Sequence, residues 1–255
     1  MKIERDIEKT LKEWQEDNSR RPLIIRGARQ VGKSYTIMEF GENEFANMIT
    51  INFEQNPEYK ACFKTLIPME IINSIGMLAR REVVPGKTLL FLDEIQECPQ
   101  AITALRYFYE QMPLLHVIGA GSLMEFTLGK EGLKMPVGRI QYLFMKPLSF
   151  LEFINALGEN QIRSFLESYT WEETVNEAIH DRLMDLVKKY SIVGGMPSVV
   201  VEYLEHRSFN RCDKVQSSII QTYREDFGKY AGRGKHKYLD RVFYAVPKMV
   251  GKKFK

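Results

Sequence analysis

The chain of 255 residues is long enough for one large domain or two modest ones with a sizeable buried core. Hydrophobic residues make up 44% and charged residues 27% of it, which is typical of a globular protein. The cysteines Cys62, Cys98 and Cys212 lie far apart and form no CxxC pair, which argues against a zinc site and a disulfide framework and favours a reducing compartment.

The net charge of +3 conceals an asymmetry along the chain. Residues 201–255 carry 13 Lys and Arg against 6 Asp and Glu, a net charge of +7, whereas residues 1–200 carry 23 against 27, a net charge of −4. A basic C-terminal part is typical of proteins that bind DNA or an acidic protein partner, and equally of a solvated surface. No aromatic stacking pattern or groove-reading motif accompanies the charge, which favours the solvated surface.

The N-terminus, "MKIERDIEKT", is charged and has no apolar core of a secretory signal. No apolar run comes near the roughly 20 residues that a membrane helix needs. We therefore expect a cytoplasmic protein with no membrane partner.

The first half of the chain alternates between short apolar runs and segments with helical spacing. Apolar residues at Ile3, Ile7, Leu11 and Trp14 predict an amphipathic N-terminal helix. Further helices are expected over 33–42, 57–63, 68–81 and 101–112, and strands over 23–27, 48–54, 87–96, 114–122 and 140–144. The third strand is almost continuously apolar, as a strand buried on both faces should be. The alternation predicts an α/β fold, a parallel sheet sandwiched by helices.

The pattern changes near Leu148. From there the periodicity predicts only helices, over 150–157, 175–190, 198–206 and 214–227. The chain therefore contains a separate helical piece after the sheet.

The stretch "GARQVGKS", Gly27 to Ser34, matches the pattern G-x-x-x-x-G-K-[ST] between an expected strand and an expected helix. Glycines let the backbone curl so that its N–H groups point at phosphate oxygens, and the following helix adds its positive N-terminus. Lys33 is expected to reach the β- and γ-phosphates, and the Ser34 hydroxyl to hold Mg²⁺. The predicted nucleotide-binding residues are Gly27, Ala28, Arg29, Gln30, Val31, Gly32, Lys33, Ser34 and Tyr35.

The stretch "TLLFLDE" supplies two carboxylates at the end of the third strand. Asp93 fits a residue that supports Mg²⁺ through water, and Glu94 fits a general base that activates the attacking water. An acidic pair in a solvated loop is the plainer alternative. The glutamate favours hydrolysis over phosphate transfer to a small molecule, for which the chain shows no acceptor-pocket signature.

Two polar residues end other strands of the expected sheet. The carboxyl ends of parallel strands face the ligand crevice, so Ser122 can sense the γ-phosphate or hold the catalytic water. It can equally be the N-cap of a helix. Asn52 ends its strand on the same edge, and we expect it to hydrogen-bond Glu94.

Several stretches, in order, resemble one known family: "RGARQVGKS", "LLFLDEIQ", "LHVIGAGSLMEF", "VGRIQYLFMKPLSFLEF" and "IVGGMPSVV". They are similar to the AAA+-superfamily ATPases of bacteria and archaea, often described as archaeal-ATPase-like, that carry a C-terminal domain of unknown function. The resemblance runs from about residue 1 to 230, and "VGR…PLSFLEF" and "GGMP" are not general P-loop features. It implies a P-loop core of the ASCE type, a helical winged-helix-like lid and a nuclease-like C-terminal domain.

The resemblance implies a division into a P-loop ATPase core over residues 1–147, a winged-helix-like lid over 148–232 and the start of a C-terminal domain over 233–255. Members of the family usually run well beyond 255 residues, so we expect a truncated third domain.

The resemblance also draws attention to Arg139, which comes immediately before the fifth strand. AAA+ proteins commonly keep an arginine finger at this position, supplied to a neighbouring subunit, which implies a homo-oligomer. The alternative is a structural arginine that pairs with a carboxylate.

The sequence thus predicts an ATP hydrolase, a switch or motor module with ATP and Mg²⁺ as ligands. Lys33, Glu94, Arg139 and Ser122 are the expected catalytic residues, and Ser34 and Asp93 the expected metal ligands. The alternative is a nucleotide-gated scaffold that binds DNA or a protein partner through its winged-helix-like region and basic C-terminal part, with slow turnover.

Overall fold

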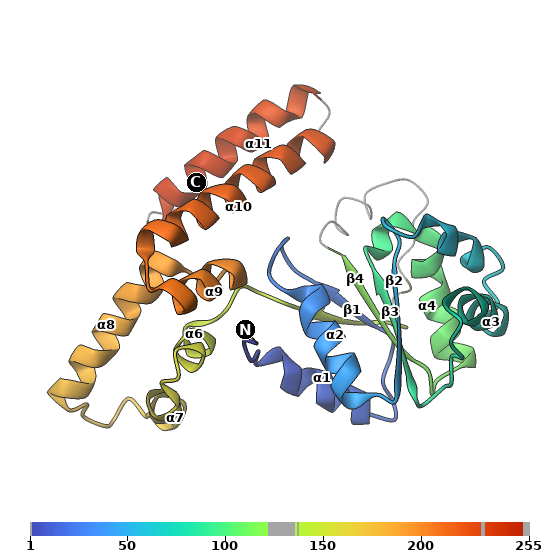
Figure 1. The fold of residues 1–255 in the computed structure, drawn as a ribbon, viewed down its shortest axis with the longest axis horizontal. Helices are drawn as coiled ribbons and strands as arrows, with labels where there is room; N and C mark the ends of the chain where they lie inside the picture. Colours follow the sequence, from blue (N-terminus) through green and yellow to red (C-terminus); the bar gives the residue numbers. More distant parts are fainter. Residues whose placement is uncertain (1, 122–135, 137, 231–232, 252–255) are drawn as a thin grey trace.

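The computed structural model describes residues 2–121, 136, 138–230 and 233–251, and the chain forms a sheet-containing part beside a helical part (Figure 1). The strands are β1 (Leu23–Arg26), β2 (Asn47–Asn52), β3 (Thr88–Asp93), β4 (His116–Gly121) and β5 (Gln141–Phe144). All neighbouring pairs are parallel, in the order β2-β3-β4-β1-β5. The predicted α/β fold with a parallel sheet is therefore confirmed, and β5 lies beside β1 at one edge.

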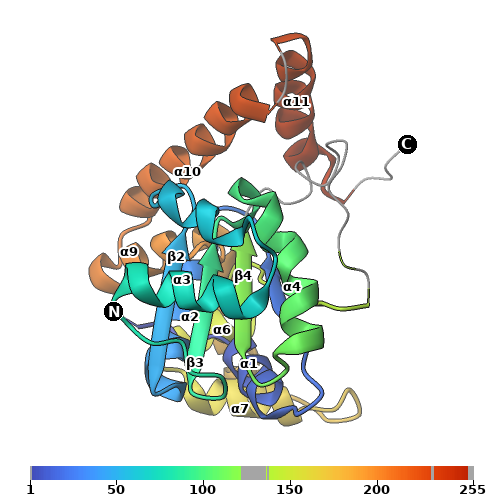
Figure 2. The same ribbon diagram turned by 90° about the vertical axis from the view of Figure 1, so that its right-hand side faces the viewer.

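Helices cover both faces of the sheet. One face carries α1 (Ile7–Glu16) and α2 (Lys33–Glu44), and the other carries the 3-10 helix η1 (Pro57–Phe63), α3 (Pro68–Ala79), the 3-10 turn η2 (Ile95–Glu97) and α4 (Pro99–Gln111) (Figures 1 and 2). The predicted elements of this part are present, with 57–63 as a 3-10 helix.

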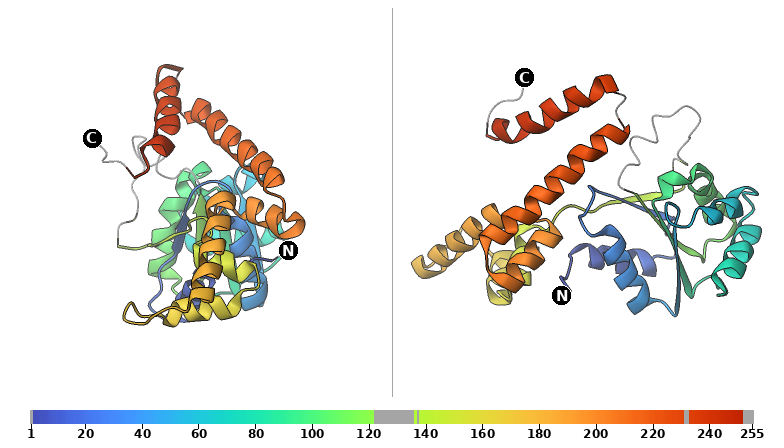
Figure 3. Two further views of the ribbon diagram at one scale, coloured as in Figure 1. Left: turned by 90° about the vertical axis from the view of Figure 1, so that its left-hand side faces the viewer. Right: turned by 45° about the horizontal axis from the view of Figure 1, so that its top comes forward.

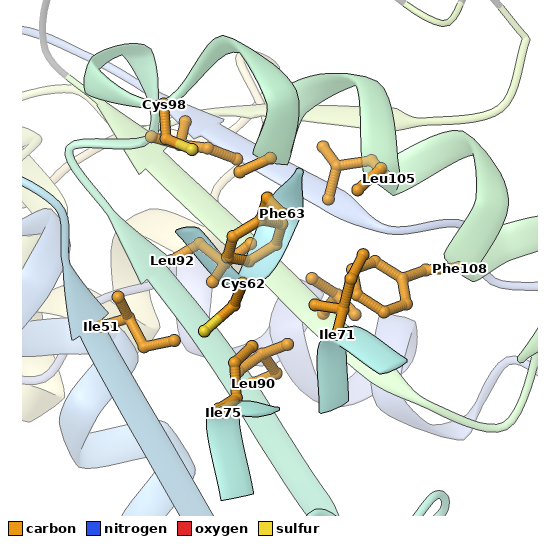
Figure 4. Close-up of a cluster of buried hydrophobic side chains, with 14 of the residues drawn as sticks. Ile51, Cys62, Phe63, Ile71, Ile75, Leu90, Leu92, Cys98, Leu105 and Phe108 are labelled. Atoms are coloured by element: carbon orange, nitrogen blue, oxygen red, sulfur yellow. The ribbon is translucent and has the colours of Figure 1, made fainter. Parts of the chain in front are cut away.

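The core between the sheet and α3 and α4 is fully apolar. Figure 4 shows Ile51 and Leu92 from β2 and β3 facing Phe63, Ile71 and Phe108 from the covering helices, and these side chains are buried. A near-continuous apolar strand such as β3, buried at all six positions, requires a layer on each side.

The helical part follows β5. It contains α6 (Phe150–Ala156), α7 (Asn160–Ser168), α8 (Glu177–Val193), α9 (Pro197–His206), α10 (Phe209–Tyr230), α11 (Arg233–Ala245) and η3 (Val246–Met249). It lies on the α1–α2 side of the sheet, and α10 and α11 run side by side away from it (Figures 1 and 3). Its own core includes Phe153, Leu186, Val199 and Tyr203.

The expected helices of this part are confirmed, whereas α7 and α11 were not foreseen. Within residues 145–230 and 233–251, which the structure describes, only helices and turns follow β5, so the winged-helix likeness stays a prediction. The helices of the described ranges are all too short or too polar to cross a lipid bilayer.

The parallel arrangement positions the polar residues that end the strands. Asn52 and Asp93 are register partners at the carboxyl ends of β2 and β3. Arg26 ends β1, directly before the glycine-containing loop. The loop and the acidic residues therefore lie on the same side of the sheet, at the carboxyl ends of its strands.

Candidate functional site: a phosphate-binding loop with two acids

The loop from Gly27 to Gly32 connects β1 to the first turn of α2 and has a strained backbone. Gln30 and Gly32 have positive φ angles of 65° and 95°. A Cβ atom on Gly27 would lie 2.2 Å from the carbonyl oxygen of Met145, so only glycine fits there. This backbone brings the N-terminus of α2, with its unpaired N–H groups, to the carboxyl edge of the sheet.

Lys33, the first residue of α2, turns its side chain back over the loop. Its Nζ donates hydrogen bonds of 2.9 Å to the carbonyl oxygens of Gly27 and Ala28. Burial lowers the pKa of the Lys33 ammonium below its ordinary 10.5, opposed by the carboxylates of Glu94 and Asp93 and assisted by the cation of Arg29. Burial removes water from the Lys33 ammonium, and an anionic partner stabilises such a charged group. The position of Lys33 therefore favours phosphate binding.

Ser34 and Asp93 bring the two predicted motifs into direct contact. The Ser34 hydroxyl donates to Asp93 Oδ2 over 2.9 Å. Asn52 Nδ2 donates to the same oxygen over 3.2 Å, so the expected bond from Asn52 to Glu94 is not formed. Asn52 is the register partner of Asp93, and the amide therefore reaches that carboxylate first.

Glu94 leaves β3 in a left-handed conformation with φ 48° and ψ 45°. Its N–H donates to Asp93 Oδ1 over 3.1 Å, and Gln96 Nε2 donates to its Oε2 over 2.5 Å. Gln96 is buried, and among the described residues its own Oε1 has no hydrogen-bond partner. Sequence reasoning missed Gln96, because its role depends on the turn that folds it back on Glu94.

Most of the predicted nucleotide-binding residues line one pocket with a volume of about 270 Å³. Its lining comprises Arg29, Gln30, Gly32, Lys33, Ser34, Tyr35, Glu94 and Thr222. The first seven come from the loop, α2 and the end of β3, whereas Thr222 comes from α10 in the helical part. Val31 instead points into the core and is fully buried.

A second, apolar pocket adjoins the first. It has a volume of about 190 Å³ and shares Gly32 and Tyr35 with the phosphate pocket. Its other side chains come from the N-terminal segment and the helical part, among them Ile3, Leu148, Pro197 and Val201. The polar and the apolar pocket thus lie next to each other at the start of α2, and both have lining residues from the sheet-containing and the helical part.

The buried side chain of Arg5 connects these parts, and no sequence motif marks it. Its guanidinium donates to the carbonyl oxygens of Val31 (3.0 Å) and Lys146 (2.7 Å) and to Glu152 Oε1 (2.9 Å). Glu152 also forms a capping box with Ser149 at the start of α6. One ion pair therefore fixes the loop, the segment after β5 and the first helix of the helical part.

Two predicted catalytic residues lie away from this pocket or beyond the described residues. Arg139 precedes β5 at the end where Gln141 pairs with Leu23, which is the end of the sheet opposite to the loop. Its Nε donates to Glu110 Oε1 over 3.0 Å, the carboxylate pairing that the structural alternative expects. Arg139 therefore cannot reach the loop of its own chain. Ser122 follows β4 and lies outside the described residues.

The oxygen atoms at the site fit a small, hard cation. Ser34 Oγ and Asp93 Oδ2 are 2.9 Å apart at the edge of the phosphate pocket. Mg²⁺ typically takes one or two protein oxygens and completes its shell with water and phosphate oxygens. Within the part of the chain that the structure describes, no three His, Cys, Asp or Glu side chains form a metal site of their own.

The sheet order, the glycine-containing loop before α2 and the acids that end β3 define a P-loop NTPase. A family model described as an AAA domain matches residues 19–154, more than half of the chain, and the chain belongs to this family. A second model, a domain of unknown function (DUF8612), matches residues 184–255. The resemblance to AAA+-superfamily ATPases with a C-terminal domain of unknown function is thereby confirmed.

Solved structures match the chain at low sequence identity. The Walker-type ATPase PABY2304 of Pyrococcus abyssi is 20% identical, with a TM-score of 0.48 over 94% of this chain and 76% of that one. The ADP form of Aeropyrum pernix ORC2 is 14% identical, with a TM-score of 0.45 over 85% and 69%. AMPPCP-bound DnaA from Aquifex aeolicus is 12% identical, with a TM-score of 0.42 over 91% and 74%. No curated protein matches the chain.

The Arg5–Glu152 pair predicts a stability effect. We expect Glu152→Gln to lower the free energy of unfolding by about 3 kcal/mol, because it leaves the buried Arg5 guanidinium without its counter-charge. Urea denaturation curves measure the change. Glu110→Gln is the matched control: its carboxylate pairs with two exposed arginines, and its loss should lower the free energy of unfolding far less than Glu152→Gln does. Equal shifts for both variants would contradict the role of the buried pair.

Proposed function

We propose that the chain binds ATP with Mg²⁺ and hydrolyses it, as a switch or motor module of the AAA+ type. The observation that carries this proposal is the 2.9 Å hydrogen bond between Ser34 and Asp93. It joins the phosphate-binding loop to the acidic end of β3, at a pocket that also contains Lys33 and Glu94.

Each group at the pocket has a chemical role in this proposal. The Lys33 ammonium and the loop N–H groups bind the β- and γ-phosphates, and Ser34 and Asp93 hold the metal. Mg²⁺, when bound, neutralises phosphate charge. Glu94 takes a proton from the attacking water, and Gln96 positions its carboxylate through the 2.5 Å hydrogen bond. Ser122 keeps its expected role as a sensor of the γ-phosphate or the water.

The apolar pocket suits the base of the nucleotide. Ile3, Leu148, Pro197 and Val201 present aliphatic surface, which a flat purine ring buries favourably. Gly32 and Tyr35 belong to both pockets, so a base in one and phosphates in the other are joined across the start of α2. A nucleotide in this position would contact both parts of the chain.

A second candidate is the nucleotide-gated scaffold, in which binding of ATP matters more than turnover. The contact of Thr222 on α10 with the phosphate pocket favours it, because the basic C-terminal part begins in the same helical region. Its partner would be DNA or a protein, bound through residues 201–255.

Loss of the Lys33 ammonium tests nucleotide binding. We expect Lys33→Ala to abolish measurable binding of Mg·ATP in calorimetry, because charge-assisted hydrogen bonds to phosphate alone correspond to about 10- to 100-fold in Kd. Lys64→Ala, which removes an exposed lysine outside the pocket, should bind like the wild type. An unchanged Kd for Lys33→Ala would rule out the loop as the ATP site.

Replacement of Glu94 separates the two candidate functions. We expect Glu94→Gln to bind ATP but to hydrolyse it at least about 100-fold more slowly, because an amide cannot accept the proton from water. Phosphate release in a single-turnover assay measures this. Glu97→Gln is the control, an exposed neighbour whose charge faces Lys60. A wild-type rate for Glu94→Gln would remove Glu94 as the base, and an effect on partner binding alone would favour the scaffold.

The proposed role of Arg139 as an arginine finger requires assembly, because the residue lies opposite the loop of its own chain. Specific ATPase activity should rise with protein concentration. Arg139→Ala should bind ATP normally and hydrolyse it up to about 1,000-fold more slowly. Mixing it with Lys33→Ala should restore activity. Arg106→Ala is the matched control, since Arg106 pairs with the same Glu110 oxygen. Equal behaviour of both variants, with no recovery on mixing, would leave Arg139 a structural role.

A further inference from the structure

Helix α10 places three side chains on the phosphate-binding loop. Arg29 Nη1 lies 2.5 Å from both carboxylate oxygens of Asp226. The Tyr223 hydroxyl donates to the carbonyl oxygen of Arg29 over 2.7 Å, and Thr222 lines the phosphate pocket itself. Positions 222, 223 and 226 lie on one face of the helix, within a single turn. The loop is therefore in contact with a helix almost 200 residues further along the chain.

The charges at this contact belong to the phosphate site. The Arg29 cation contributes, after burial, to the lowered pKa of Lys33, so both cations act on the same small region. The Asp226 side chain is only 10% exposed and that of Arg29 25%, so solvent screens their interaction incompletely. A phosphate group binds a guanidinium in the same way as a carboxylate does. Asp226 and nucleotide phosphates are thus alternative anions for Arg29.

We infer that the Arg29–Asp226 pair is a nucleotide-responsive contact, in which the phosphates of ATP compete with Asp226 for Arg29 and thereby displace α10 from the loop. The inference rests on the proposed ATP site. Asp226 would then face a polyanion at close range. The repulsion between the Asp226 carboxylate and the phosphates adds to the loss of its bond to Arg29. In this arrangement the helical part would present the Asp226 carboxylate to the phosphates. The cation that responds to the phosphates, Arg29, would lie in the loop.

The displacement of α10 would reach α11 through direct contacts. Phe243 of α11 packs edge-on against Tyr223 and Phe227 of α10, and Arg224 pairs with Asp240. Figures 1 and 3 show the two helices side by side and projecting from the helical part. Tyr223 contacts both the loop and α11, so a change at the pair is transmitted to the far end of the chain.

The test compares two charge removals on neighbouring residues of α10. Asp226→Asn keeps the shape of the side chain and removes its charge. Glu225→Gln does the same at an exposed position whose carboxylate bonds only within α10 among the described contacts. Labels on Lys64→Cys in the sheet-containing part and Ser217→Cys in α10 report the distance between the parts, because both positions are exposed. The native cysteines are buried, and burial raises the pKa of their thiols, so they label slowly.

We expect Mg·ATP to change the label distance in the wild type. Asp226→Asn should show this change already without ATP and should bind ATP about tenfold more tightly, the scale of one charge-assisted hydrogen-bonded pair. Glu225→Gln should match the wild type in both measurements. Tyr223→Phe, which removes only the hydroxyl bond to the loop, should shift both in the same direction by less.

Two outcomes separate failure of this inference from failure of the proposed function. If the wild type binds ATP but the distance stays constant, and Asp226→Asn has the Kd of Glu225→Gln, the contact does not respond to nucleotide and the inference is wrong. If the wild type binds no ATP, the proposed function fails and the nucleotide response with it. In that case equal label distances in Asp226→Asn and Glu225→Gln would also show that the pair does not hold α10 in place.

Discussion

The buried ion pair between Arg5 and Glu152 is the interaction on which the geometry of the site depends. Removing two charges from water is costly, and the cost is offset only when every hydrogen-bonding group has a partner. Here the guanidinium binds the loop at Val31, the segment after β5 at Lys146 and the first helix of the helical part at Glu152. The loop cannot change its path without leaving Arg5 unsatisfied, so the pair couples the loop to the position of the helical part.

The helical part is thereby held to the loop at two places of different character. The Arg5–Glu152 side chains are 6% and 7% exposed, which suits a permanent connection. The Arg29–Asp226 side chains are 25% and 10% exposed, and Arg29 lines the phosphate pocket, which suits a connection that a ligand can replace. In the nucleotide-responsive contact inferred above, the helical part would turn about the first connection when anions enter the pocket. Arg5 lines the apolar pocket together with Gly32 and Tyr35, so this pocket adjoins the permanent connection.

The sequence predicted what depends on local pattern. The alternation of strands and helices gave the parallel sheet, and the spacing of Gly27, Gly32 and Lys33 gave the loop, because both are set by residues a few positions apart. Contacts between distant segments were missed: Arg5, Thr222 and Asp226 have no motif that marks them. The partner of Asn52 was predicted wrongly because strand register, which the sequence does not specify, places its amide on Asp93 and leaves Glu94 to Gln96. Helix α11 was missed because its sequence is predominantly polar and basic, although its apolar residues are arranged with helical spacing.

Backbone strain marks both halves of the site. Gln30 in the loop and Glu94 after β3 have left-handed conformations, which cost a residue other than glycine about 1–2 kcal/mol. Such conformations persist only where surrounding bonds fix them, and at Glu94 these are the bonds to Asp93 Oδ1 and from Gln96 and Glu97. The turn aims the carboxylate into the pocket with Lys33 and does not allow the strand to continue. In the proposed function a base must be in place before its substrate arrives, and these bonds hold Glu94 in one position.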